Sequence, residues 1–357
     1  MSDTLYDIAV IGAGPAGAQA AISGCHQMRH VLVLDAGGIS PRQGRAYWSK
    51  SVEFEDVPVF TGITGPKLKK ALREWMEARP VRDVTIAGED RKYGIEVRPG
   101  VLLKLTREDD AFRLDTSVAR LDKQLEVQAT ETFRARTVVV ASGFEDKWPN
   151  IECDPSAARL FDQYRVAFRY AGNKRGWHVC IRCDGHLHID QHMAFYGVGD
   201  YIYEMVIGAQ DFTDKLTILT DGRPHGMSKK VHDHAMAMGV NIDERKIAKH
   251  IGEKTDLLGF EMEDGEQAFF HGFFVDEGLD PNTLFLEGWD VATDEDGLLE
   301  VDDDNQVLDA AGEPVSGLYA AGDIVADERK LITAAFGMGQ NAGICASDSL
   351  RKWRYPR

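Results

Sequence analysis

Two cysteines separated by two residues and followed by an acid form the segment best suited to chemistry. Cys180 and Cys183 can close a small disulfide ring or open to a dithiol, and Asp184 can exchange a proton with a sulfur. The chain has five cysteines, and the other three are widely scattered, unlike a disulfide framework. We therefore interpret the pair as chemically active rather than structural.

Metal binding is one alternative for the same pair. Cys180 and Cys183 could ligate zinc together with neighbouring histidines, because CxxC spacing permits tetrahedral coordination. The candidate ligands are His186, His188 and His192. No second CxxC follows, however, and the first two histidines are close in sequence. We therefore expect a redox pair and no metal.

A glycine-rich turn near the N-terminus indicates what exchanges electrons with the cysteines. Residues 7–11 and 31–34 are apolar runs typical of buried parallel strands, and residues 18–23 favour a helix between them. The first run leads into GAGPAG, which matches the GxGxxG dinucleotide fingerprint. Gly14 lets the backbone approach a pyrophosphate, and Asp35, about 20 residues later, can accept a hydrogen bond from a ribose hydroxyl.

Further strand-and-glycine motifs extend the pattern. Residues 193–196 lead into Gly197-Val198-Gly199, and a helical pattern and an apolar run follow. Residues 137–143 and 317–323 are strands that end in glycine turns, and residues 272–283 are expected to carry the chain back to the first domain. The sequence therefore predicts an α/β protein with two Rossmann-like nucleotide-binding domains.

Together these segments resemble the low-molecular-weight thioredoxin reductase family of FAD flavoproteins. Residues 12–17 are similar to its FAD phosphate loop, and residues 180–185 to its Cys-x-x-Cys-Asp-Gly centre. Residues 280–283 are similar to its Pro-Asn-Thr crossing segment, and residues 317–323 to its late Gly-Asp motif. The similarity covers nearly the whole chain in the family's order.

The resemblance implies a discontinuous FAD-binding domain, residues 1–147 and 280–357, with a CxxC domain, residues 148–279, inserted into it. It implies that FAD is held by Gly12, Gly14, Pro15, Ala16, Gly17, Asp35, Ala36, Gly143, Gly322, Asp323, Arg329, Lys330 and Leu331.

The resemblance also implies roles for the redox centre. Cys183 is the sulfur nearest the flavin, Cys180 exchanges with the partner's disulfide, and Asp184 is the acid/base. The implied partner is a thioredoxin-like protein or a small disulfide or dithiol, and the implied assembly is a homodimer.

Several positions depart from the family pattern. Ile202 stands where the small residue of GxGxxA lets a helix approach a strand, and Asp221 stands where arginines grip the 2′-phosphate of NADPH. Lys330 replaces a glutamine and can either favour an anionic reduced flavin or point to solvent. Trp353 and Tyr355 can either stack on the flavin or lie in a frayed tail.

These departures disfavour NADPH, whereas Asp221 could still meet the ribose of NADH. We expect another donor, such as a ferredoxin-type protein, as in deep-branching or ferredoxin-linked disulfide reductases. The alternatives are a dithiol oxidase that passes electrons to oxygen, a conventional NAD(P)H-dependent thioredoxin reductase, and a flavin-binding protein without turnover.

The charge and apolar content of the chain argue against two classes of partner, nucleic acids and membranes. The chain has 357 residues and a formal net charge of -17, so it repels phosphate backbones and anionic lipids. Its first residues lack the pattern of a signal peptide, and no apolar run approaches the roughly 18 residues of a membrane span. We therefore expect a cytoplasmic protein that binds neither nucleic acid nor membrane.

Overall fold

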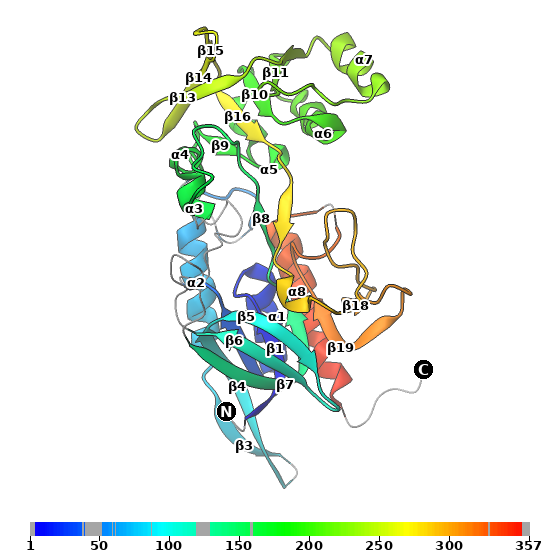
Figure 1. Ribbon diagram of the computed structural model, residues 1–357. Coiled ribbons are helices and arrows are strands. Elements are labelled where there is room, and N and C mark those ends of the chain that lie inside the picture. Colours follow the sequence, from blue (N-terminus) through cyan, green and yellow to red (C-terminus); the bar gives the residue numbers. More distant parts are fainter. Residues whose placement is uncertain are drawn as a thin grey trace. The chain divides into compact units, whose positions relative to one another are not determined.

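The computed structural model describes residues 4–37, 39, 52–58, 60, 62–86, 88–118, 129–157, 160–327 and 329–351. They form two compact units (Figure 1). Within the described ranges, the first unit takes Met1–Pro41, Lys67–Glu145 and Asp280–Arg357, and the second takes Arg42–Pro66 and Asp146–Leu279.

The centre of the first unit is strand β1 (Leu5–Ile11). It pairs in parallel with β2 (His30–Asp35) on one side and with β7 (Thr130–Val140) on the other. Each strand contains a run of four or five buried residues. Burial on both faces of the sheet explains why the sequence reads here as continuous apolar runs.

The remaining strands extend this sheet to the order β18-β19-β7-β1-β2-β4-β3. A hairpin of β5 and β6 pairs with β7 through β6. The bounds of these strands are β3 (Arg82–Ile86), β4 (Glu89–Pro99), β5 (Val101–Arg107), β6 (Phe112–Ser117), β18 (Gln306–Leu308) and β19 (Pro314–Ala320).

Helices α1 (Pro15–His26) and α8 (Ile332–Ser349) pack closely against each other in the first unit. The contact depends on glycine, because a Cβ at Gly339 would lie only 2.1 Å from the carbonyl oxygen of Ala16. Helix α2 (Gly65–Glu77) is the other long helix of this region. The close approach therefore places Gly339 of α8 against the first turn of α1.

The second unit has a five-stranded parallel sheet with the order β12-β11-β10-β16-β9. A separate antiparallel sheet consists of β13, β14 and β15. The bounds are α3 (Leu160–Gln163), α4 (Arg165–Arg169), β9 (Trp177–His178), α5 (Ile181–Asp184), η2 (Gly185–His188), β10 (Met193–Tyr196), α6 (Gly199–Ala209), β11 (Leu216–Leu219), α7 (Lys229–Ala237), β12 (Asn241–Asp243), β13 (Ile247–Glu253), β14 (Asp256–Met262), β15 (Gln267–Phe269) and β16 (Gly272–Val275).

The chain passes between the units in two short strands that pair with each other, β8 (Phe144–Asp146) and β17 (Leu279–Pro281). Hydrogen bonds hold the neighbouring segments together. Ser142 Oγ donates to Asn282 O at 2.8 Å, and Asn282 Nδ2 donates to Ser142 O at 3.1 Å. The serine of the Ala-Ser-Gly turn therefore ties it to the Pro-Asn-Thr segment; a short 3-10 turn, η3 (Leu284–Leu286), follows.

The predicted α/β fold is confirmed, with one correction. Residues 272–275, expected in the return crossing, instead form β16 inside the second parallel sheet. All four are buried, so their short apolar run belongs to a core strand. The crossing itself begins at β17 (Leu279–Pro281).

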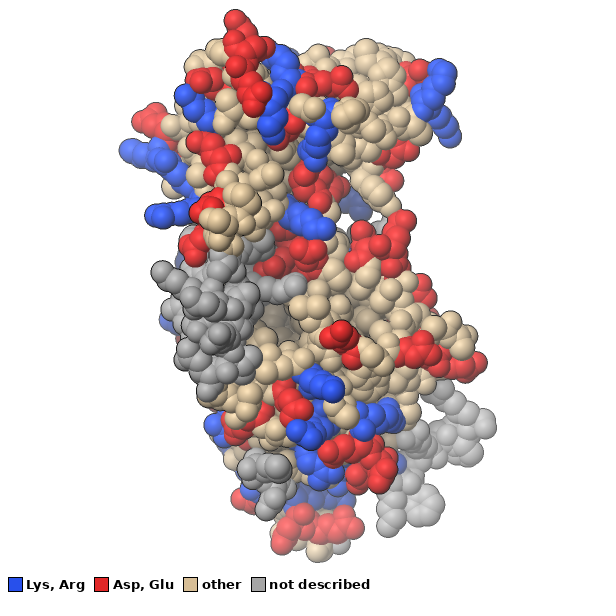
Figure 2. Space-filling view, viewed as in Figure 1, with Lys and Arg blue, Asp and Glu red and all other residues tan. Residues whose placement is uncertain are grey.

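The helices and the surface charge of the described residues bear on contact with membranes and nucleic acids. None of the described helices has the length and apolar character needed to cross a membrane. Figure 2 shows acidic and basic side chains interspersed over the face in view, without a continuous basic patch there.

Candidate active site

Cys180 and Cys183 form a disulfide, with their Cα atoms 5.3 Å apart. Cys180 lies at the N-cap of α5, where its Sγ accepts a hydrogen bond from Cys183 N at 3.1 Å. Both residues are half-buried, whereas Asp184 at the end of the same turn is buried. One helical turn thus presents the sulfur pair and directs the following carboxylate inward.

Asp184 contacts a histidine that no sequence motif indicates. Asp184 Oδ2 lies 2.9 Å from Nδ1 of His178, which is in β9, two residues before Cys180. His178 Nε2 lies 3.3 Å from Nε2 of His188, and His188 Nδ1 lies 3.2 Å from Oε1 of Gln191. The carboxylate is therefore the end of a buried chain of polar side chains.

The histidines considered as zinc ligands have other contacts. His186 Nε2 lies 3.1 Å from Glu55 Oε2, and His192 Nε2 lies 2.9 Å from Thr217 Oγ1. Burial and the neighbouring His178 lower the pKa of His188 to about 4. Across the described ranges, no three His, Cys, Asp or Glu side chains gather as a metal site would require.

The first glycine turn lies between β1 and α1 and leaves no room for a side chain at Gly12 or at Gly17. Gly12 has φ +109°, and a Cβ there would lie 2.3 Å from the carbonyl oxygen of Ala141. A Cβ at Gly17 would lie 1.9 Å from Gly12 O. Helix α1 starts with Gly14 as N-cap and Pro15 in its first turn, with no side-chain cap and no acidic residue there. This helix start suits an anionic diphosphate.

Other predicted cofactor residues lie at strand ends of the same sheet. Asp35 ends β2, and its Oδ1 accepts a hydrogen bond from Gly37 N at 2.9 Å; Ala36 follows it. Gly143 follows β7 with φ +62°, and a Cβ there would meet open space. Gly322, after β19, has φ +78°, and a Cβ there would lie 2.7 Å from Ala16 Cβ. The structure thus brings the turn at Gly322 and Asp323 next to the start of α1.

The segment before α8 supplies the last predicted residues. Arg329 is exposed and pairs with Asp327 at 2.8 Å. Lys330 Nζ donates to the carbonyl oxygens of Asp323 and Val325, and Leu331 is the N-cap of α8. The Lys330 ammonium therefore stabilises the turn after β19. This contact differs from both expected roles, which were to favour an anionic reduced flavin or to point to solvent. Trp353 and Tyr355 lie outside the described residues.

The second glycine turn, between β10 and α6, differs from the first because a loop covers it. Gly199 N donates to His225 O at 2.8 Å, and Asp200 Oδ1 accepts from Ser228 N at 2.8 Å. The start of α6 therefore already has a carbonyl against it, and the carboxylate of Asp200 in its first turn binds the loop. Ile202 is fully buried, and a Cβ at Gly197 would lie 3.2 Å from its Cδ1. The isoleucine is accommodated beside Gly197, and the loop with His225 and Ser228 lies over the start of α6.

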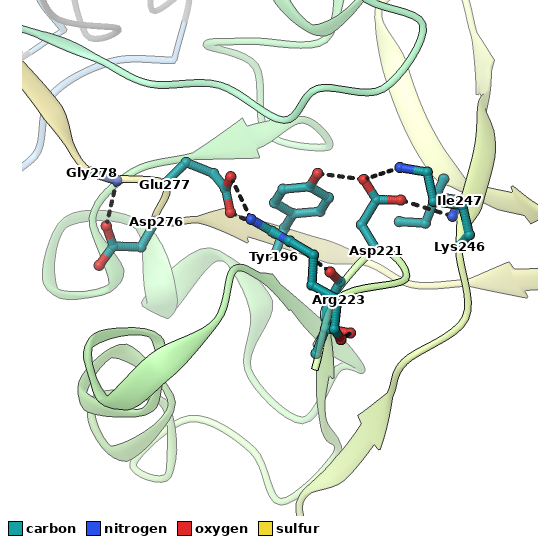
Figure 3. A network of polar contacts seen from close by, with 9 residues as sticks. Tyr196, Asp221, Arg223, Lys246, Ile247, Asp276, Glu277 and Gly278 are labelled. Atoms are coloured by element: carbon teal, nitrogen blue, oxygen red, sulfur yellow. Dashed lines mark hydrogen bonds and ion pairs between the residues drawn. The ribbon is translucent and has the colours of Figure 1, made fainter. Parts of the chain in front are cut away.

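Asp221, which could meet the ribose of NADH according to the sequence, has three donors within the protein. It is buried at the end of β11, with φ +55°. Its Oδ2 accepts from Tyr196 Oη at 2.7 Å and from Lys246 Nζ at 2.9 Å, and its Oδ1 accepts from Ile247 N at 2.9 Å (Figure 3). Burial and Asp221 raise the pKa of Tyr196, which stays a donor.

A second ion pair crosses the same sheet edge. Arg223 Nη1 and Nη2 lie 2.9 and 2.7 Å from the two carboxylate oxygens of Glu277, which follows β16 (Figure 3). The guanidinium also lies 5.3 Å from the centre of the Tyr196 ring. We call Tyr196, Asp221, Arg223, Lys246 and Glu277 the crevice network. It lies at the carboxyl ends of β10, β11 and β16, where open α/β sheets bind their ligands.

The chain matches the pyridine nucleotide-disulphide oxidoreductase family over residues 6–339. It belongs to this family. The match includes both glycine turns and the Cys180–Cys183 disulfide, so the chain is a thioredoxin reductase-like disulfide oxidoreductase.

Individual relatives of this oxidoreductase are distant. It is 26% identical to thioredoxin reductase of Mycolicibacterium smegmatis, over 99% of this chain and 97% of that protein. It is 25% identical to a component of the alkyl hydroperoxide reductase of Escherichia coli, over 97% of this chain but only 58% of the relative. Thioredoxin reductase of Streptococcus pyogenes shares the fold, with a TM-score of 0.77 and 22% identity over 98% of this chain and 99% of that one.

Proposed function

We propose that this oxidoreductase uses FAD to move electrons between a flavin and the Cys180–Cys183 pair, without NADPH as donor. Its partner is a thioredoxin-like protein or a small disulfide, and it works as a homodimer. The observation that carries the proposal is the contrast between the two glycine turns. The first is free of acidic and capping side chains, and the second has a loop and an aspartate against it.

The residues around the first turn fit FAD. Gly12 permits the tight turn against Ala141, Gly17 lets α1 pack close to Gly12, and Asp35 offers a carboxylate at the end of β2. Gly322 and Asp323 approach the same turn from β19. When bound, the flavin supplies the two-electron chemistry, while this chain orients it and provides the thiols.

The crevice network supports independence from NADPH. A nucleotide would have to displace the carbonyl of His225 from Gly199 N and the carboxylate of Asp200 from its place at α6. Arg223, the arginine of the crevice network, could not bind the nucleotide's phosphates freely, because its guanidinium already binds both carboxylate oxygens of Glu277. Acidic groups at this edge repel a diphosphate. We therefore propose a ferredoxin-type protein as the donor.

The cysteines take the roles implied by the resemblance. Cys180 is the thiol that attacks the partner's disulfide, Cys183 exchanges electrons with the flavin, and Asp184 moves the proton. A thiolate is the nucleophile in such exchange, so a proton acceptor near the pair raises its rate.

The test uses a small dithiol as the reductant, so it does not depend on the natural donor. Added anaerobically, excess dithiol should open the Cys180–Cys183 disulfide and bleach the flavin absorbance of the wild-type protein. Cys183→Ser should keep its flavin but lose bleaching by at least about 100-fold in rate, because the sulfur that reaches the flavin is gone.

The matched control is Cys153→Ser, since Cys153 is a free, half-buried thiol of the same unit. It should bleach as the wild type does. Bleaching of Cys183→Ser at the wild-type rate would contradict the assignment. A wild-type protein that binds flavin but does not bleach would instead be a flavin-binding protein without turnover.

A further inference from the structure

His178 and His188 form a buried imidazole pair behind the redox centre. The His178 side chain is 2% exposed and that of Asp184 is 9% exposed. His188 is 1% exposed as a residue. Titratable side chains are rarely enclosed this fully unless each has a polar partner. Here each contacts the next, from Asp184 through His178 and His188 to Gln191.

The fold makes room for this pair. A Cβ at Gly272 in β16 would lie 2.8 Å from Cγ of His188, so the ring of His188 occupies space that only glycine leaves free. Phe274, in the same strand, faces both rings, with centroids 5.2 Å from His178 and 6.1 Å from His188. The imidazoles thus have an apolar strand on one side. Proton transfer along them is shielded from bulk water.

The hydrogen-bond partners of His178 determine which of its ring nitrogens can hold a proton. Its Nδ1 faces the Asp184 carboxylate, and its Nε2 lies 3.3 Å from the carbonyl oxygen of Lys174. Gln191 Oε1 can only accept, so His188 donates to it from Nδ1. Neutral His188 then presents a lone pair at Nε2 to His178. His178 is therefore surrounded by acceptors at both ring nitrogens.

The remaining charges near the pair are few. Lys174 opposes protonation of His188, whereas Asp184 favours it, and burial outweighs both. On the β16 side, Gly272 and Phe274 contribute no charge. Asp184 is thus the acidic side chain hydrogen-bonded to the pair, and it is the side chain next to Cys183 in the sequence.

We propose that His178 and His188 are positioning residues for the thiol chemistry: they hold, together with Asp184, the proton that the cysteines release and the partner's sulfur takes up. This inference rests on the proposed function and adds residues to it that the Cys-x-x-Cys-Asp-Gly centre does not contain.

The exchange balances without a further reactant. The Cys180 thiol gives its proton to the Asp184–His178 pair, and its thiolate attacks the S–S bond of the partner. A mixed disulfide forms, and the first partner sulfur leaves and takes up that proton. Cys183 then loses its proton and attacks the mixed disulfide, the second partner sulfur leaves as a thiol, and the Cys180–Cys183 bond forms again. The partner is reduced by two electrons and the dithiol is oxidised by two.

The experiment measures how the alkylation rate of the reduced cysteine pair by iodoacetamide depends on pH. The pair is first reduced with a small dithiol, which is then removed, so the experiment reads thiolate formation directly and does not need the natural electron donor. His178→Asn keeps a donor toward Asp184 but cannot carry a second proton, so we expect the pH midpoint of alkylation to rise by about one unit. His188→Phe keeps a ring beside Gly272 without its nitrogens and should shift the midpoint upward by about half a unit.

The matched control is His186→Gln, because His186 lies between Asp184 and His188 in the sequence but contacts Glu55 instead. It should titrate as the wild type does. Midpoints that coincide in the wild type, His178→Asn and His188→Phe would overturn the inference, and so would an equal shift in the control. If only one of the two variants folds, the pH midpoint of that variant, compared with the wild type, decides whether the inference holds.

The results distinguish failure of the proposed function from failure of the inference about His178 and His188. If a small dithiol cannot open the wild-type Cys180–Cys183 disulfide, the proposed function fails and takes the inference with it. If the disulfide opens and the midpoints coincide, the inference alone fails.

Discussion

Gly12 and Gly197 occupy the same place in two similar strand–turn–helix segments, because each directly follows the buried strand. A Cβ at Gly12 would lie 2.3 Å from Ala141 O, and a Cβ at Gly197 would lie 2.5 Å from Asp276 O. The segments differ two residues later, where the N–H of Gly199 donates to His225 O. Both turns are therefore constrained by a neighbouring backbone, and a loop also covers the second one.

Gly12→Ala tests the first turn. The new methyl group would clash with Ala141 O, and the residue would be held at φ +109°, so the free energy of unfolding should fall by about 3 kcal/mol or more. Bound flavin should be lost, which absorbance after gel filtration detects.

Gly312→Ala is the matched control, because Gly312 has φ +83° and open space around it. It carries the backbone strain without the clash, so it should cost about 1 kcal/mol and keep the flavin. Equal losses in the two variants would show that the contact with Ala141 is unimportant.

At the scale of elements, the crevice network joins the ends of strands that are distant in sequence. Asp221 follows β11, whereas its partners Tyr196 and Lys246 lie in β10 and before β13. Such a carboxylate is stable inside the protein because three donors compensate for its lost hydration. The network is therefore a structural part of the sheet edge, and in the proposed function it also excludes a nucleotide.

Asp221→Asn should lower the free energy of unfolding by about 2–3 kcal/mol, measured by urea denaturation. An amide nitrogen replaces one acceptor, so a buried donor loses its partner. The exposed Asp211 of the same unit provides the control, and Asp211→Asn should change stability by less than about 0.5 kcal/mol. A similar loss in both variants would contradict the role of the network.

The elements that the sequence predicted best are those with long apolar runs. Residues 7–11, 31–34 and 193–196 are strands, because burial on both faces leaves an unbroken hydrophobic signal. β9, with only Trp177 and His178, is too short to carry such a signal. The assignment of residues 272–275 to a crossing was wrong for a related reason, since a run of four residues does not indicate its sheet.

Site residues could be predicted from the sequence only where they lie close together in a recognisable motif. Cys180, Cys183 and Asp184 are adjacent, so the sequence identified them together. His178 lies close to them in sequence, but a single histidine carries no spacing signal. Arg223 and Glu277 meet only because β11 and β16 flank β10, which requires the sheet order. For the same reason, the three donors of Asp221 could not be predicted from the sequence.

For the whole molecule, similarity and local structure give different information about the electron donor. The family match covers both nucleotide-binding folds, and the resemblance to thioredoxin reductases extends over the whole chain. The sheet edge of the second unit nevertheless carries two ion pairs between its own side chains, Arg223–Glu277 and Lys246–Asp221. Conservation of a fold does not require conservation of every ligand that the fold can hold.

An anaerobic absorbance titration of the flavin tests the central claim, independence from NADPH, most directly. NADPH, NADH and reduced ferredoxin are added in turn to the purified holoprotein, with dithionite last as a positive control. We predict no bleaching by either nucleotide and bleaching by reduced ferredoxin. Bleaching within seconds of adding NADPH would contradict the claim, because the nucleotide would then have displaced the loop and the crevice network.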